Sequence, residues 1–174
     1  MTIFDLKRVK LRAGEQLREE IEVQLEPLLL GGQQYLPVPA LVPAELTITK
    51  ASSGSVFELE FRVRLHGPCF RCLADAVLAP AVQAREYHAA GADVDEELRS
   101  PYVADDALDL SAWARDALAL QLPDKILCRP DCAGLCPVCG KDLNLEPHVH
   151  DEERSDPRWA ALEALRDSSD VPQR

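Results

Sequence analysis

Hydrophobic and polar residues alternate along the first half of the chain in a way that predicts β-strands. Apolar residues alternate with glutamate and glutamine over residues 20–26, and the alternation resumes at Leu46 and Ile48. The longest stretch is residues 55–65, where five apolar side chains share one face and charged side chains share the other. A period of two is typical of a strand with one solvated face. We expect strands at these three places and a shorter one over residues 82–86.

The segments between and after these strands have different patterns. Residues 28–43 are broken by proline and glycine, which predicts turns. Residues 89–107 are acidic with few large apolar side chains, which predicts a loop or linker. Apolar residues then recur at helical spacing over residues 110–122. We expect a helix there, with Asp109 or Ser111 as its N-cap.

A second helix is predicted near the C-terminus, where Asp156 suits an N-cap and the proline behind it suits the first turn. Strands come first, and a helix and clustered cysteines come last. This order predicts an α+β fold: an antiparallel β-rich N-terminal part, a helix, a cysteine-rich knuckle module and a short C-terminal helix. The expected parts are residues 1–88, a linker at 89–107, residues 108–166 packed with the first part as one domain, and a mobile tail at 167–174.

The net charge, the N-terminal residues and the lengths of the apolar runs argue against several classes of protein. The 174 residues contain 19 basic and 30 acidic side chains, a formal net charge of −11. This acidic balance argues against a non-specific nucleic-acid binder. The N-terminal residues carry charges that a signal peptide lacks, and no apolar run is long enough to span a membrane. We therefore expect a cytoplasmic protein with no membrane partner.

All six cysteines lie in two tight clusters, and two histidines follow the second cluster. These eight candidate metal ligands are Cys69, Cys72, Cys128, Cys132, Cys136, Cys139, His148 and His150. Thiolates separated by two residues can bind one ion together, and cytosolic thiols stay reduced. Disulfides, free core cysteines and a redox pair are the alternatives. We interpret the pattern as structural Zn²⁺, one or two ions per chain.

Two divisions of these ligands are open from the sequence. In one, Cys69, Cys72, Cys128 and Cys132 hold one ion, while Cys136, Cys139, His148 and His150 hold the other. In the rival, Cys128, Cys132, Cys136 and Cys139 form one site, and Cys69 and Cys72 are free or paired differently. Basic side chains flank the cysteines, and four of them are candidate partner-binding residues: Arg62, Arg64, Arg71 and Arg129.

Two parts of the chain resemble a known family. One is the strand that leads into Cys69-Phe70-Arg71-Cys72. The other is Gly134-Leu135-Cys136-Pro137-Val138-Cys139-Gly140-Lys141-Asp142-Leu143-Asn144, followed by Asp156-Pro157-Arg158. From about residue 20 to 166 this order resembles the bacterial YceD family, small cytosolic proteins with relatives in plant organelles. Many members carry Cys-x-Cys where this chain has His148-Val149-His150, which keeps two metal-competent donors at the same spacing.

The resemblance implies a role in accumulation of large-subunit ribosomal RNA. We expect a zinc-binding, non-catalytic factor in ribosome biogenesis that promotes synthesis, processing or stability of that RNA. Its partner would be ribosomal RNA or a basic large-subunit ribosomal protein, and no small-molecule substrate is expected. A metal-dependent nuclease or hydrolase is one alternative, but catalytic zinc keeps an open position that four donors fill. A zinc-ribbon transcription regulator is another, but it would need a basic helix or arm.

Overall fold

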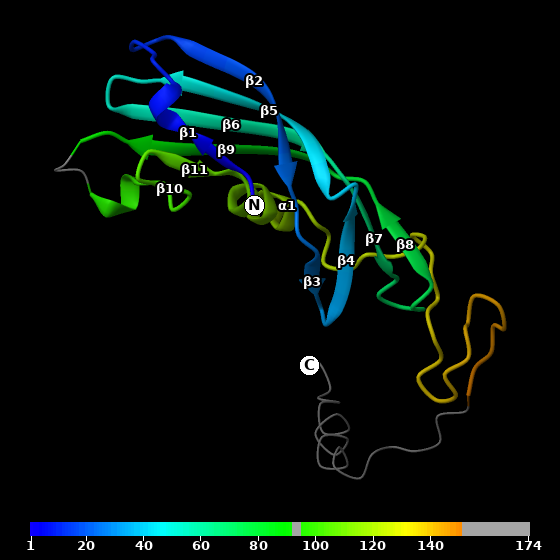
Figure 1. Ribbon diagram of the computed structural model, residues 1–174. Helices are drawn as coiled ribbons and strands as arrows, with labels where there is room; N and C mark the ends of the chain where they lie inside the picture. Colours follow the sequence, from blue (N-terminus) through cyan, green and yellow to red (C-terminus); the bar gives the residue numbers. More distant parts are fainter. Residues whose placement is uncertain (92–94, 151–174) are drawn as a thin grey trace, which may run out of the picture. The chain divides into compact units, whose positions relative to one another are not determined.

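The computed structural model describes residues 1–91 and 95–150, which form mostly antiparallel β-sheet with one α-helix. The chain divides into two compact units, Met1–Gly134 and Leu135–Arg174. The first unit holds every named strand of the described part (Figure 1). Its long sheet has the order β2 (Gln16–Gln24), β5 (Leu41–Lys50), β6 (Gly54–Arg62) and β9 (Ala81–Ala89). A second sheet has the order β3 (Leu28–Leu30), β4 (Gln33–Val38), β7 (Arg64–Pro68) and β8 (Asp75–Leu78). A third has the order β1 (Ile3–Asp5), β11 (Ala107–Asp109) and β10 (Val103–Ala104).

The long sheet confirms the strands expected at 20–26, 46–48 and 82–86. Its inward face is lined by the alternating apolar residues, and register places Leu46 opposite Leu59 and Ile48 opposite Phe57. Leu46 and Leu59 are fully buried. The period of two therefore identified the face that packs into the core, because side chains two residues apart point to the same side of a strand.

The single strand expected over residues 55–65 was wrong in one respect. β6 ends at Arg62, Val63 is buried outside both strands, and β7 begins at Arg64 in the second sheet. Alternation continues through this break because both sheets bury the same side of the chain. A periodic pattern reports which face is buried, and it does not report which neighbour supplies the hydrogen bonds.

The turns expected over residues 28–43 were also wrong, since this segment contains β3, β4 and the start of β5. Gly31 and Gly32 form the turn between β3 and β4, with φ values of 55° and 80°. A two-residue hairpin turn of type I′ requires positive φ at both positions, which glycine adopts without strain. The glycines therefore marked a hairpin, and Tyr35 beyond them is buried in the core.

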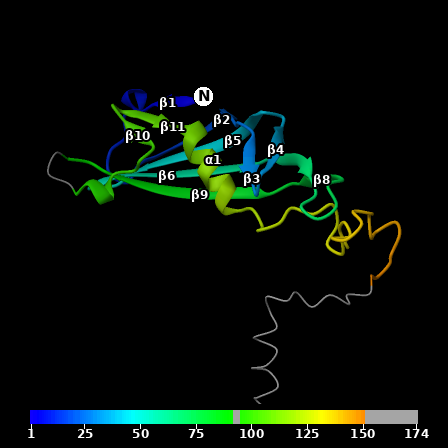
Figure 2. The same cartoon turned by 90° about the horizontal axis from the view of Figure 1, so that it is seen from below.

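The predicted helix is present as α1 (Leu110–Leu120), which ends two residues earlier than expected. Asp109 is its N-cap, and its side chain accepts a hydrogen bond from the N–H of Ala112 at 3.0 Å. The other candidate, Ser111, accepts instead from the N–H of Thr2 at 2.7 Å and ties the N-terminus to the helix. α1 covers one face of the long sheet (Figure 2), with Trp113 and its apolar neighbours buried.

The expected linker at residues 89–107 contains short regular elements. Within residues 89–107 the chain forms a 3-10 helix, Glu96–Leu98, and then β10 and the start of β11. The expected C-terminal helix and the tail at 167–174 lie outside the described residues. The proposed boundaries at 88 and 107 remain a prediction. Among the described residues, none of the helices has the length and apolar character needed to cross a membrane.

Candidate metal centres

The first cysteine pair lies in the turn between β7 and β8. The N–H of Cys69 donates to the carbonyl of Ala74 at 2.7 Å, and the N–H of Leu73 donates to the carbonyl of Cys69 at 3.0 Å. Leu73 has a φ of 62°, which lets the chain double back within the turn. Cys69 and Cys72 are both buried. The hairpin thus holds two thiols on the inner side of one tight loop.

The chain that follows α1 returns to this hairpin. The N–H of Phe70 donates to the carbonyl of Ile126 at 2.8 Å, and Ile126 is itself buried in the core. The guanidinium of Arg71 donates to the carbonyl of Cys132 at 2.7 Å. These two hydrogen bonds fasten the second cysteine pair to the first.

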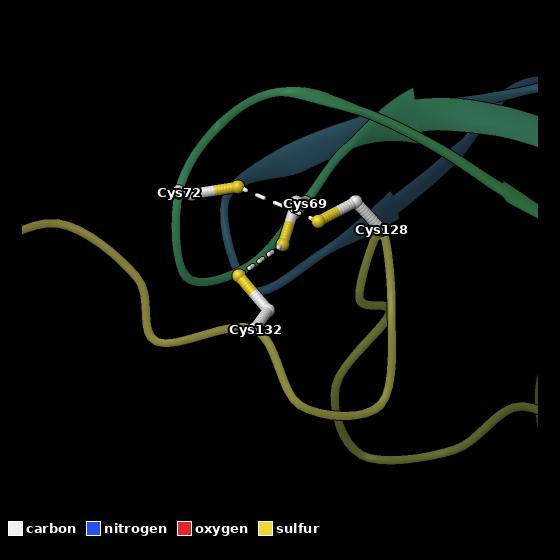
Figure 3. A group of neighbouring side chains, drawn as sticks. All are labelled: Cys69, Cys72, Cys128 and Cys132. Carbon is white, nitrogen blue, oxygen red and sulfur yellow. Dashed lines mark hydrogen bonds between the residues drawn. The ribbon is translucent and has the colours of Figure 1, made fainter. Parts of the chain in front are cut away.

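Four sulfur atoms from these segments point toward one another (Figure 3). The Sγ atoms of Cys69 and Cys132 are 3.8 Å apart, and those of Cys72 and Cys128 are 3.6 Å apart. A disulfide requires about 2.05 Å, so neither pair is bonded. Four thiolates arranged tetrahedrally around Zn²⁺ at about 2.3 Å have their sulfurs about 3.8 Å apart. All four ligand atoms lie within 4.8 Å of one another. The spacing is compatible with zinc.

The thiols of this cluster differ in acidity. Burial alone would raise the pKa of Cys69, but N–H donors of Cys72, Cys128 and Arg71 outweigh it and lower the pKa to about 6. Burial, together with hydrogen bonding to Cys72, raises the pKa of Cys128 to about 12. Adjacent thiols cannot all become anions without a cation among them. A divalent ion removes that repulsion, because metal ligands bind as thiolates.

The second cluster lies in the second unit and is built on a tighter turn. The N–H of Cys136 donates to the carbonyl of Lys141 at 2.8 Å, and the N–H of Gly140 donates to the carbonyl of Cys136 at 2.9 Å. Gly140 has a φ of 73°, which glycine adopts without strain. N–H donors of Cys139 and Val138 lower the pKa of Cys136 to about 6. This turn stabilises a thiolate.

The two histidines close this cluster from the other side. Nε2 of His148 lies 3.1 Å from Sγ of Cys139, and Nδ1 of the same ring lies 2.7 Å from the carbonyl of Glu146. A ligating histidine usually donates its second N–H to a carbonyl in this way, which directs the other nitrogen at the metal. The ring centroids of His148 and His150 are 4.9 Å apart. The four ligand atoms of Cys136, Cys139, His148 and His150 also lie within 4.8 Å of one another.

The eight donors therefore lie in two groups of four, which is the first of the two divisions left open by the sequence. Whether each group binds a metal ion stays a prediction. Sequence reasoning did not find the groups that orient the donors, the carbonyl of Glu146 and the guanidinium of Arg71. Every residue has a backbone carbonyl, so the sequence does not show which carbonyl accepts a hydrogen bond from a histidine. The residues around Arg71 likewise do not show whether its side chain supports the cluster or is exposed to solvent.

The four candidate partner-binding arginines have different surroundings. Arg62 and Arg64 are exposed, and within residues 1–91 and 95–150 neither forms an ion pair. Arg129 pairs with Asp131 at 3.4 Å. Arg71 supports the cysteine cluster as described above. The exposed pair is therefore the part of this set whose charge is most available to a partner.

Comparison with known proteins adds a family to this geometry. The model of the family described as "Large ribosomal RNA subunit accumulation protein YceD" matches residues 57–166. The chain belongs to the YceD family. An uncharacterized protein of Mycobacterium tuberculosis is 38% identical over 137 residues, which are 76% of this chain and 66% of the relative. An uncharacterized protein of Mycobacterium leprae is 38% identical over 60% of this chain and 49% of its own length.

A named relative of the YceD family comes from maize. It is the chloroplastic "Large ribosomal RNA subunit accumulation protein YCED homolog 1", 40% identical over 52 residues, 30% of this chain and 17% of the maize protein. The matched part of this chain spans slightly less than two thirds of the length of the mycobacterial relatives. No solved structure has a significant match to the chain.

Proposed function

We propose that the protein is a zinc-binding, non-catalytic factor that promotes the accumulation of large-subunit ribosomal RNA. Support comes from two closed groups of four sulfur and nitrogen donors in a chain of the YceD family. A tetrahedral shell with four protein ligands has no position left for a substrate or an activated water, which favours a structural role.

The first zinc would serve to hold the β7–β8 hairpin against the segment that follows α1. Cys72 and Cys128 are 56 residues apart in sequence, so the ion would join distant parts of the chain. A partner surface built across both segments would then depend on the metal. The exposed residues on these segments include Arg64 and His66 on β7 and Arg129 beyond α1.

The proposed contact region comprises Arg62, Arg64, Arg71 and Arg129, and the partner is ribosomal RNA or a basic ribosomal protein. The net charge of −11 favours a basic protein, because complementary charge speeds encounter. The arginines around the first cluster favour direct contact with RNA, because their positive charges can bind phosphates. Salt dependence separates the two, since RNA contacts release counterions and weaken steeply as salt rises.

The test is capture of partners from growing cells by the tagged, zinc-loaded chain at a series of salt concentrations. If the partner is RNA, Arg62→Glu/Arg64→Glu should reduce its capture, because the change removes positive charge from two exposed positions, and zinc content should stay unchanged. Lys7→Glu/Arg115→Glu is the matched control with the same change of net charge. Equal capture by the wild type and both variants would exclude Arg62 and Arg64 as contacts. Cells lacking the protein should accumulate less mature large-subunit RNA, and the purified protein should leave RNA uncleaved.

A further inference from the structure

A cavity of about 760 Å³ opens at the end of the long sheet, and its lining includes no cysteine. Its floor is apolar and includes Ile48 on β5 and Phe57 on β6, both buried. The segment that leaves the short helix Leu6–Arg8 forms one wall through Val9 and Leu11. A volume of about 300–1,000 Å³ is usual for a small-ligand pocket.

The inward face of the sheet changes character in this cavity. The pairs Leu46–Leu59 and Ile48–Phe57 on β5 and β6 are apolar, and the second of these rows ends at Glu86 on β9. The next row places Lys50, Ser55 and His88 side by side on β5, β6 and β9. All three side chains line the cavity. A row that served packing alone would continue the apolar pattern, because polar groups on a core-facing surface lose hydration.

The three polar groups of this row are arranged as hydrogen-bond donors. Nζ of Lys50 lies 3.5 Å from Oγ of Ser55. The N–H of Ser100 donates to Nδ1 of His88 at 3.3 Å, so the neutral ring carries its proton on Nε2. Burial, followed by the neighbouring charges of Arg99 and Lys50, lowers the pKa of His88 and favours that neutral ring.

Cationic side chains outnumber acidic ones around the cavity, although the chain as a whole is acidic. Four cationic side chains line it, Lys10, Arg12, Lys50 and Arg99, against the single carboxylate of Asp106. No carboxylate in the described part of the chain forms an ion pair with Lys10, Arg12 or Lys50. A small anion can reach a local basic pocket although the net charge of the chain is −11, because the potential inside a pocket depends mainly on the nearest charges.

We propose that this cavity binds a small organic anion, with its phosphate or carboxylate among Lys10, Arg12 and Lys50 and its apolar body against the half-buried Val9 and Leu11. The site is separate from the metal clusters and does not depend on the proposed ribosomal role. It gives the protein a ligand site in addition to a partner surface, and the sequence pattern had suggested no small molecule.

The probes are phenyl phosphate and benzoate, titrated calorimetrically into the zinc-loaded full chain in phosphate-free buffer. Phenol and inorganic phosphate are the controls for the ring and the anion alone. We expect saturable one-to-one binding of at least one anionic probe, about tenfold or more tighter than either control, since one hydrogen bond to a charged group ordinarily supplies that factor. The ranking of phenyl phosphate against benzoate identifies the preferred head group.

The location is tested with Lys10→Gln/Arg12→Gln, which removes two exposed charges, and with Lys7→Gln/Arg18→Gln as the charge-matched control outside the cavity. The first variant should weaken the anionic probe about tenfold or more, and the second should leave it unchanged. In the wild type, amide resonances of Lys50, Ser55 and His88 should shift on titration. Absence of saturable binding by both anions, equal binding of phenol, or equal loss in the two variants would each overturn the proposal.

Discussion

The double substitution Cys69→Ser/Cys72→Ser removes the two hairpin ligands of the first cluster. It should abolish the binding of one zinc ion and most of the zinc-dependent stability of the first unit. The ion would close a loop, because Cys69 and Cys132 are 63 residues apart and Cys72 and Cys128 are 56 apart. A cross-link around a loop of about 60 residues stabilises the folded state by about 4 kcal/mol through the entropy of the unfolded chain. For a unit of this size that is a Tm change of roughly 12 °C.

The assay compares zinc-loaded and chelator-stripped protein for each variant, so that the cost of serine in a buried position cancels. Zinc per chain is measured by mass spectrometry under native conditions, and unfolding is followed by circular dichroism. The wild type should hold two ions. Removing zinc should lower the Tm of the unfolding transition of its first unit, called the first transition here, by about 12 °C. The variant should hold one ion and show almost no loss in that transition. Cys136→Ser/Cys139→Ser is the matched control, with one ion and the full wild-type shift of the first transition.

Either of two results would refute this reasoning. If Cys69→Ser/Cys72→Ser still binds two ions, those cysteines are not ligands and the rival grouping around Cys128 regains support. If the variant holds one ion but keeps the wild-type zinc-dependent shift, the ion does not join the hairpin to the segment beyond α1.

Three further changes test the surroundings of the clusters and the core. Arg71→Met keeps the aliphatic stem but removes the 2.7 Å hydrogen bond to the carbonyl of Cys132, so the first cluster should bind zinc about 10- to 100-fold more weakly in chelator competition; unaltered affinity would mean that this contact is dispensable. Asp109→Ala removes the N-cap of α1 and should lower the free energy of unfolding by about 1 kcal/mol in urea, with zinc content unchanged. Leu59→Ala empties a fully buried position in the long sheet and should cost about 2–5 kcal/mol in the same measurement, and a loss below 1 kcal/mol would show that the core collapses around the gap.

The elements that local rules describe were predictable. Alternation in β2, β5 and β9 located their buried faces, and helical spacing with an aspartate before it located α1. These features depend on side chains within a few residues of one another. The split at Val63 was not predictable, because one alternating run served two sheets and only the hydrogen-bond partners distinguish them. The hairpin at Gly31 and Gly32 was mistaken for an irregular turn for the same reason: its strands are short and depend on partners elsewhere in the chain.

The eight candidate donor residues could be named from the sequence alone, because thiols separated by two or three residues and a His-x-His pair are local patterns. Their grouping was left open, since Cys69 and Cys72 precede the nearest other cysteine by more than fifty residues. Only the tertiary structure placed them with Cys128 and Cys132, through the hydrogen bond from Phe70 to Ile126 and the anchoring of Ile126 in the core. The same holds for the cavity at the end of the long sheet, where strand register aligns Lys50, Ser55 and His88. Spacing along the chain determines chemistry that a single turn can assemble, whereas sites made from distant segments are determined by packing and register, which depend on the whole fold.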